Sequence, residues 1–138
     1  MKPLPPVIQL DATGCALATI ATLARKPYLD IKQRAAALGI HPEDQSLWSE
    51  TGYFYRLAKD QGIQLAEQPT PFTDWESLPD LAVLSIKWHQ VNDRPFWHWV
   101  VFQRTEQGNV VLDSKKALKT HHRTDFGRIK PKWFIEVL

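Results

Sequence analysis

The sequence predicts an α+β fold in which N-terminal helices pack on a C-terminal antiparallel sheet. Two observations predict it: apolar residues recur at helical spacing up to Gly62, and shorter apolar, β-rich runs follow that glycine. Helices that precede the strands, instead of alternating with them, are typical of two-layer α+β domains. A length of 138 residues suits one domain, so residues 1–138 are interpreted as a single unit.

Three helices are predicted from cap and stop signals in the first part of the chain. The first is expected to begin at Cys15 after a Thr13 cap and to stop at Pro27. The second runs from an Asp30 cap to Gly39, and the third spans about Ser49 to Asp60. The first helix therefore carries a cysteine in its first turn.

Strands are predicted wherever short apolar or β-branched runs lie between turn residues. The five predicted strands are Ile63–Ala66, Leu81–Trp88, Trp97–Arg104, Val110–Asp113 and Trp133–Val137. Thr73–Glu76 fits the capping box of a brief helix. Thr105–Asn109 is expected to turn a β-hairpin, because Gly108 and Asn109 tolerate positive φ.

Composition excludes several classes of protein. With 43% hydrophobic and 23% charged residues, the chain does not resemble disordered, collagen-like or coiled-coil sequences. Its apolar runs, such as Leu81–Leu84, are far shorter than the ~18 residues that cross a bilayer, and its start has no hydrophobic stretch typical of a secretory signal. We therefore expect a cytoplasmic protein without a membrane span.

Positive charge gathers near the C-terminus. Residues 114–132 carry seven Lys and Arg side chains against one acid, Asp125, a local net charge of +6 in a chain of net charge +2. Such an excess either forms a solvated loop or attracts an acidic peptide, a phosphate backbone or a partner protein. The six tryptophans are scattered through predicted elements and suit core filling better than base stacking, so nucleic acid is not an expected partner.

Cys15 is the residue most informative about chemistry. As the only cysteine it excludes an intramolecular disulfide and any multi-cysteine metal site. A thiol in the first turn of a helix faces unpaired backbone N–H groups and the positive end of the helix dipole, and both favour the nucleophilic thiolate. The alternative is a small buried apolar residue.

His98 and Asp113 are the expected partners of that thiol. His98 opens a predicted strand, and Asp113 ends the next, antiparallel strand, so the two side chains can come together. An imidazole that takes the thiol proton and a carboxylate that orients the imidazole complete the set that thiol catalysis needs. A buried core histidine and a turn aspartate are the alternatives. His89 can line the same cleft, whereas His121 and His122 lack further ligands at a spacing that suits a metal.

The order of these residues resembles that of papain-like cysteine peptidases. The segment VIQLDATGCALATIATLA resembles the nucleophile segment of these peptidases. The resemblance is strongest to the bacteriocin-processing peptidases, which remove double-glycine leader peptides. In that family a glutamine stands six residues before the cysteine, as Gln9 stands before Cys15, and a histidine and an aspartate occupy strands as His98 and Asp113 do. The chain departs from the family pattern at Gly14, Ala16 and Ser114, where the family has Asp, Gly and Pro.

The resemblance implies a Cys-His-Asp peptidase that works through an acyl-enzyme and needs no cofactor or metal. It implies Cys15 as the nucleophile, His98 as general base and acid, Asp113 as the orienting carboxylate, and Gln9 as an oxyanion-hole donor beside the Cys15 backbone N–H. The implied substrate is a peptide or protein, and a transporter or secretion partner would act in trans.

Two other functions are compatible with the same residues. A deamidase or acyltransferase of transglutaminase-like type uses the same three side chains. A non-catalytic module would keep the cleft as a peptide-binding groove and use the basic segment at residues 115–132 to dock an acidic partner.

Overall fold

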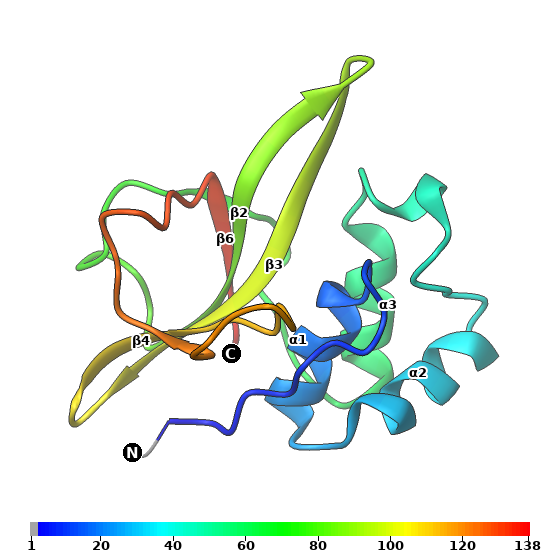
Figure 1. The fold of residues 1–138 in the computed structure, drawn as a ribbon, viewed down its shortest axis with the longest axis horizontal. Coiled ribbons are helices and arrows are strands. Elements are labelled where there is room, and N and C mark those ends of the chain that lie inside the picture. The colour runs from blue at the N-terminus through cyan, green and yellow to red at the C-terminus, as the bar shows by residue number, and fades with distance from the viewer. Residues whose placement is uncertain (1–2) are drawn as a thin grey trace.

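Three helices lie beside a six-stranded antiparallel sheet in the computed structural model, which describes residues 3–138 (Figure 1). The α+β class expected from the sequence is therefore confirmed. The helices are α1 (Cys15–Ala24), α2 (Tyr28–Ala37) and α3 (Gly52–Asp60), with one 3-10 turn, η1 (Gln45–Leu47). The strands are β1 (Thr70–Pro71), β2 (Leu81–Val91), β3 (Arg94–Thr105), β4 (Gly108–Leu112), β5 (His122–Arg123) and β6 (Trp133–Glu136).

Helix α1 is the central helix of the fold. It begins at Cys15, as predicted, but its N-cap is Gly14 instead of Thr13, and no side chain caps it. Its end is set by Arg25, which adopts the left-handed conformation at φ 56°. All residues from 16 to 22 are buried, and most are alanine or threonine, so the helix can approach the sheet closely.

The other two helices begin at different residues from those predicted. The Pro27 carbonyl accepts the backbone N–H groups of Asp30 and Ile31, so α2 begins at Tyr28 and Asp30 lies within its first turn, where a negative charge favours the helix dipole. Helix α3 begins at Gly52, later than the predicted start at Ser49, after the separate turn η1.

The sheet has the strand order β1-β6-β2-β3-β4-β5, and each neighbouring pair is antiparallel. Strands β2 and β3 form a long hairpin that extends beyond the two strands predicted there. Its turn consists of Asn92 and Asp93, both at positive φ (52° and 64°), which is the geometry of a type I′ hairpin. Strand β4 ends at Leu112, so Asp113 lies just beyond the ladder.

Two predicted elements are not formed within residues 3–138. Ile63–Ala66 provides one isolated bridge, between Leu65 and Val137, instead of a strand. Thr73–Glu76 is not a helix, because Asp74 accepts the Ser77 backbone N–H at 2.8 Å and closes a local turn. The edge strands β1 and β5 were not predicted, since two residues carry too little pattern to identify a strand.

The helices pack on one face of the sheet through a single apolar cluster. It joins buried residues of all three helices to Val83, Trp99 and Ile135 of the sheet. Phe54 of α3 stacks on Trp99 with ring centroids 4.0 Å apart and planes 3° apart. Such a pair contributes ~0.5–1.5 kcal/mol beyond its buried area. This cluster fixes α1 against β3, which sets the position of Cys15.

The opposite face of the sheet carries a second apolar cluster that a two-layer prediction does not include. Val100 and Phe102 of β3 meet Trp75, Phe126 and Ile129, which come from loops before β2 and after β5. The alternation of β3 therefore places Trp97 and Trp99 toward the helices, and His98 on the face of Val100 and Phe102. None of the helices formed by residues 3–138 is long and apolar enough to cross a bilayer.

Candidate active site

Cys15 is the first residue of α1, and residues of α2 hold the short loop that precedes it. The Gly14 N–H donates to the Asp11 carbonyl at 3.0 Å. The Tyr28 hydroxyl donates to the Asp11 carboxylate at 2.6 Å, which lowers the pKa of Asp11, and the Lys32 ammonium pairs with the same carboxylate at 3.0 Å. A Cβ at Gly14 would overlap the Tyr28 hydroxyl, so this position requires glycine. The sulfur is thus placed by packing as well as by the helix.

His98 and Asp113 form the ion pair that the hairpin register predicts. His98 Nε2 lies 2.7 Å from Asp113 Oδ1. Because Asp113 occupies Nε2, the Nδ1 atom is the ring nitrogen left for the hydrogen bond between His98 and Cys15. Strand β3 continues past the end of β4, so His98 stands at an open strand edge, where it lines the same cavity as Cys15. Cys15 acts on the pKa of His98 and lines the same cavity, so the three residues form one interacting group.

The carboxylate of Asp113 is completely buried and fully partnered. Besides His98, it accepts the Lys115 backbone N–H and an Arg123 N–H, each at 3.0 Å. Its backbone is fixed by His121, whose carbonyl accepts the Asp113 N–H and whose Nδ1 lies 2.7 Å from the Asp113 carbonyl. A carboxylate held in this way cannot rotate away from the imidazole.

These contacts set the charges of the pair. Burial lowers the pKa of His98, but the hydrogen bonds to Asp113 and Cys15 and their charges outweigh burial and raise the pKa to about 9. Burial raises the pKa of Asp113, but His98, the Lys115 N–H and Arg123 together hold it at about 2. An imidazolium beside a carboxylate is therefore the stable form at neutral pH.

Cys15 and His98 open on a cavity of about 190 Å³. Ala12, Thr13, Cys15 and His98 line it together with five aromatic side chains: Trp48, Tyr53, Phe96, Trp97 and Trp99. The Tyr53 hydroxyl accepts the Trp99 indole N–H at 3.3 Å, and burial together with the negative charge of Cys15 raises the pKa of Tyr53. A cavity that combines aromatic side chains with a few polar groups is typical of a small-substrate or side-chain site.

Gln9 lies close to this site, but its side chain has a different task from the predicted one. Its Nε2 donates to the carbonyls of Asp11 and Ala12 at 3.1 and 2.9 Å, and its Oε1 accepts the Ser114 hydroxyl at 3.0 Å. Both amide hydrogens are used, so none remains for an oxyanion. Gln9 instead ties the loop before Cys15 to the residue after Asp113.

Two residues of the site were not predicted. Arg123 bridges Asp113 and Asp125, and sequence showed it only as one cation among seven in the basic segment. Tyr53 was part of a predicted helix, and its phenol gave no signal that separates it from core aromatics. Both lie far along the chain from Cys15, so only the folded packing identifies them.

The remaining histidines lie outside the cavity. His89 is exposed on the β2–β3 hairpin and stacks on Phe96, so it does not line the cleft as anticipated. His122 is exposed in β5. Within residues 3–138 no group of three or more His, Cys, Asp or Glu side chains is placed to hold a metal ion.

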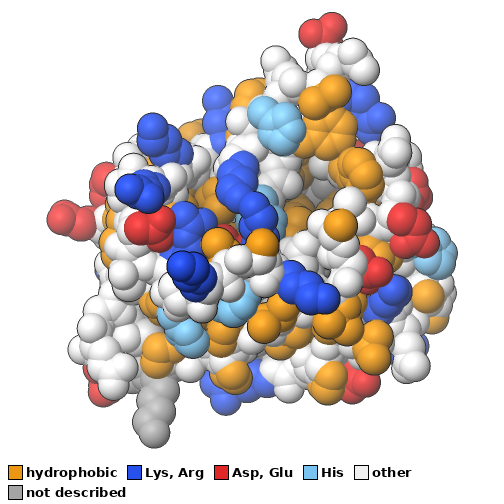
Figure 2. All heavy atoms as spheres, in the orientation of Figure 1, with side chains coloured by type: hydrophobic (Ala, Val, Ile, Leu, Met, Phe, Trp, Pro, Cys, Tyr) orange, Lys and Arg blue, Asp and Glu red, His pale blue; other side chains and the backbone are white. Residues whose placement is uncertain are grey.

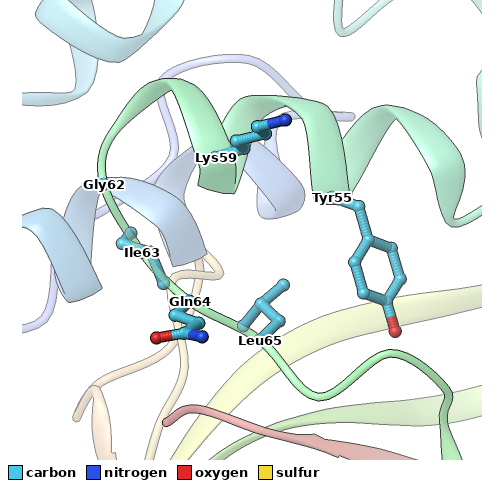
Figure 3. A pocket seen from close by; sticks show the side chains of 6 residues that line it. All are labelled: Tyr55, Lys59, Gly62, Ile63, Gln64 and Leu65. Carbon is cyan, nitrogen blue, oxygen red and sulfur yellow. The ribbon is translucent and has the colours of Figure 1, made fainter.

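A second hollow, of about 420 Å³, lies away from the cysteine, between α3 and the segment that follows it (Figure 3). Tyr55, Ile63 and Leu65 line it, and Lys59 is its one charged side chain. It contains no nucleophile and no acid, so it offers no chemistry of its own. The Cys15 cavity is the candidate active site. Neither a protein-family model nor a curated protein sequence matches this chain.

Proposed function

We propose that this protein is a papain-like thiol hydrolase that cleaves a peptide bond through a covalent acyl-enzyme. The observation that carries the proposal is that Cys15 and His98 line one cavity, while the buried carboxylate of Asp113 lies 2.7 Å from the His98 ring. A cysteine at a helix entrance, with its histidine on a strand and its aspartate just after the adjacent antiparallel strand, also agrees with the papain-like resemblance of the sequence.

The chemistry proceeds in two halves. The Cys15 sulfur attacks the substrate carbonyl carbon after its proton has passed to His98 Nδ1, and a tetrahedral oxyanion forms. His98 then returns the proton to the leaving amine as the C–N bond breaks, which leaves a thioester. Water, deprotonated by His98, attacks the thioester, and the Cys15 sulfur leaves as the carboxylic acid product forms.

The oxyanion is assigned to donors other than Gln9. The Cys15 backbone N–H belongs to the first turn of α1, where N–H groups have no helical acceptor. The Tyr53 hydroxyl lines the same cavity, and because its oxygen accepts from Trp99, its own proton is free to be donated. Loss of one such donor typically slows acyl transfer by ~10²–10³.

Mass spectrometry of a peptide library tests the proposal. We expect the wild type to cut a subset of peptides, and Cys15→Ala and His98→Ala to lose at least ~10³-fold of that rate. His89→Ala is the matched control, because His89 is an exposed histidine of the same hairpin and is expected to keep full activity.

Other products would overturn the peptidase assignment. A gain of one mass unit on glutamine without chain cleavage identifies a deamidase, the second enzyme class compatible with the three side chains. Full activity of Cys15→Ala removes the nucleophile assignment. Absence of turnover, with an iodoacetamide-unreactive Cys15, makes the cleft a binding groove.

A further inference from the structure

A concave basic pocket lies on the sheet side of Asp113. It encloses about 450 Å³, and five of its nine lining residues are cations while none is acidic. The cations are Lys87, Arg123, Arg128, Lys130 and Lys132. Figure 2 shows Lys and Arg side chains gathered over the face that carries the segment between β4 and β6. We refer to this hollow as the basic pocket.

The backbone holds these cations in place. Ile129 is 3% exposed and anchors the segment in the second apolar cluster, so Arg128 and Lys130 on either side of it remain exposed. The Lys132 N–H donates to the Ser85 carbonyl at 2.9 Å, which fixes the end of the segment against β2. Lys87 lies in the bulge of β2 at positive φ (55°).

The positive charges are crowded and only partly neutralised. Burial and the neighbouring cations Lys115 and Arg123 lower the pKa of Lys87. Arg123 is paired with two carboxylates, Asp113 and Asp125, but neither lines the basic pocket. Like charges held together in a concave surface produce a positive potential that an anion relieves.

The basic pocket and the Cys15 cavity each share lining residues with a third hollow. An intermediate hollow of about 390 Å³ shares Trp97 with the cavity, and it shares Trp88 and Lys132 with the basic pocket. Its other walls include Pro69, Pro71, Pro95 and Trp133. A bound chain can therefore run from the sulfur across an apolar, proline- and tryptophan-lined hollow to the cations.

We propose that the basic pocket binds acidic side chains of the peptide substrate, separated from the scissile bond by an apolar stretch that occupies the intermediate hollow. This specificity rests on the proposed peptide hydrolase function. A peptide is favoured over a nucleic acid because the path is apolar, and because the Lys132 ammonium already lies 4.7 Å from the centre of the Trp88 ring, the face on which a base would stack.

Fluorescence anisotropy with a labelled hexaglutamate peptide tests the pocket directly. We expect hexaglutamate to bind at low salt at least ~10-fold more tightly than hexaglutamine, and binding to weaken as salt rises. Lys130→Glu is expected to weaken hexaglutamate binding ~3–10-fold. Lys59→Glu makes the same change of net charge on α3, outside the basic pocket, and is expected to change binding less than ~2-fold.

Three outcomes decide the proposal. Unchanged hexaglutamate affinity in Lys130→Glu, with a folded protein by circular dichroism, overturns it. Tighter binding of a thymidine hexanucleotide than of hexaglutamate would reassign the pocket to nucleic acid. A Lys130→Glu variant that loses kcat/KM only on peptides with an acidic extension, and keeps it on neutral peptides, supports it.

The test separates this proposal from the proposed function. Cys15→Ala is expected to bind hexaglutamate as the wild type does, because the basic pocket does not contain the sulfur. If the protein binds hexaglutamate but cleaves no peptide, the proposed hydrolase function and its substrate are refuted. The basic pocket would then remain an anion-binding site. Loss of the anion site alone would leave cleavage of neutral peptides unchanged.

Discussion

Replacement of Asp113 by asparagine should change the protonation of His98. The pKa of His98 is about 9 because the hydrogen bonds and charges of Asp113 and Cys15 outweigh its burial. A carboxylate 2.7 Å from the imidazole and fully buried is the strongest of these contributions, and such a neighbour typically moves a pKa by ~1–3 pH units. We expect Asp113→Asn to lower the His98 midpoint by about 2 pH units, or about 3 kcal/mol. At pH 8 the protonated fraction would then fall from about 90% to about 10%.

The assay is an NMR titration of the imidazole resonances, with His98→Gln used to assign the signal. Asp125→Asn is the matched control, since Asp125 also pairs with Arg123 but does not touch His98. Stability gives a second readout. Because the pKa of His98 is about 9 in the fold and ~6.5 in the unfolded chain, its protonation stabilises the protein fully below pH 6.5, and this stabilisation is lost as pH rises through 9. The Asp113→Asn variant should lose most of this dependence of stability on pH. A His98 midpoint that stays near 9 in Asp113→Asn would refute the assignment of Asp113 as the partner that holds the imidazolium.

Two further changes test the loop before Cys15. Gly14→Ala should lower the free energy of unfolding, measured by urea unfolding, by about 2 kcal/mol and slow cleavage, because the new Cβ meets the Tyr28 hydroxyl. Adding Tyr28→Phe to this variant should recover part of the loss, whereas the control Gly52→Ala should be neutral because a Cβ there meets nothing. Gln9→Glu should lower the free energy of unfolding by about 2–4 kcal/mol, because carboxylate oxygens would face two backbone carbonyls. Unchanged stability with a ~10²–10³-fold slower reaction would instead support Gln9 as an oxyanion donor.

Cys15, His98 and Asp113 could be predicted to come together because each stands at the boundary of a strongly patterned element. Helical periodicity starts at Cys15, strand alternation starts near His98, and the next strand ends at Asp113. An antiparallel hairpin with a short turn then determines which residues meet. The two-residue turn at Asn92–Asp93 was not predicted, and it lengthens both strands of the β2–β3 hairpin beyond the predicted limits.

The interactions that support these residues follow no local pattern. Gln9 stands at the spacing that suggests an oxyanion donor, but the direction of its amide is set by the carbonyls of Asp11 and Ala12, which depend on the loop conformation. Gly14 is identified in the sequence only as a departure from the family pattern, whereas its constraint in the structure is Tyr28, a residue of the following helix. Such contacts depend on tertiary packing, and a single sequence does not contain them.

Arg123 gives the basic segment a direct role in the candidate active site. In the proposed mechanism His98 loses its charge when it transfers its proton to the leaving amine, and Asp113 would then be a buried carboxylate beside a neutral imidazole. Arg123 remains paired with Asp113 through this step, at 3.0 Å, so the carboxylate stays ionised and the imidazole keeps its orientation. The same guanidinium lines the basic pocket. The basic segment therefore places one cation against the buried carboxylate of Asp113 and presents others to the proposed acidic substrate.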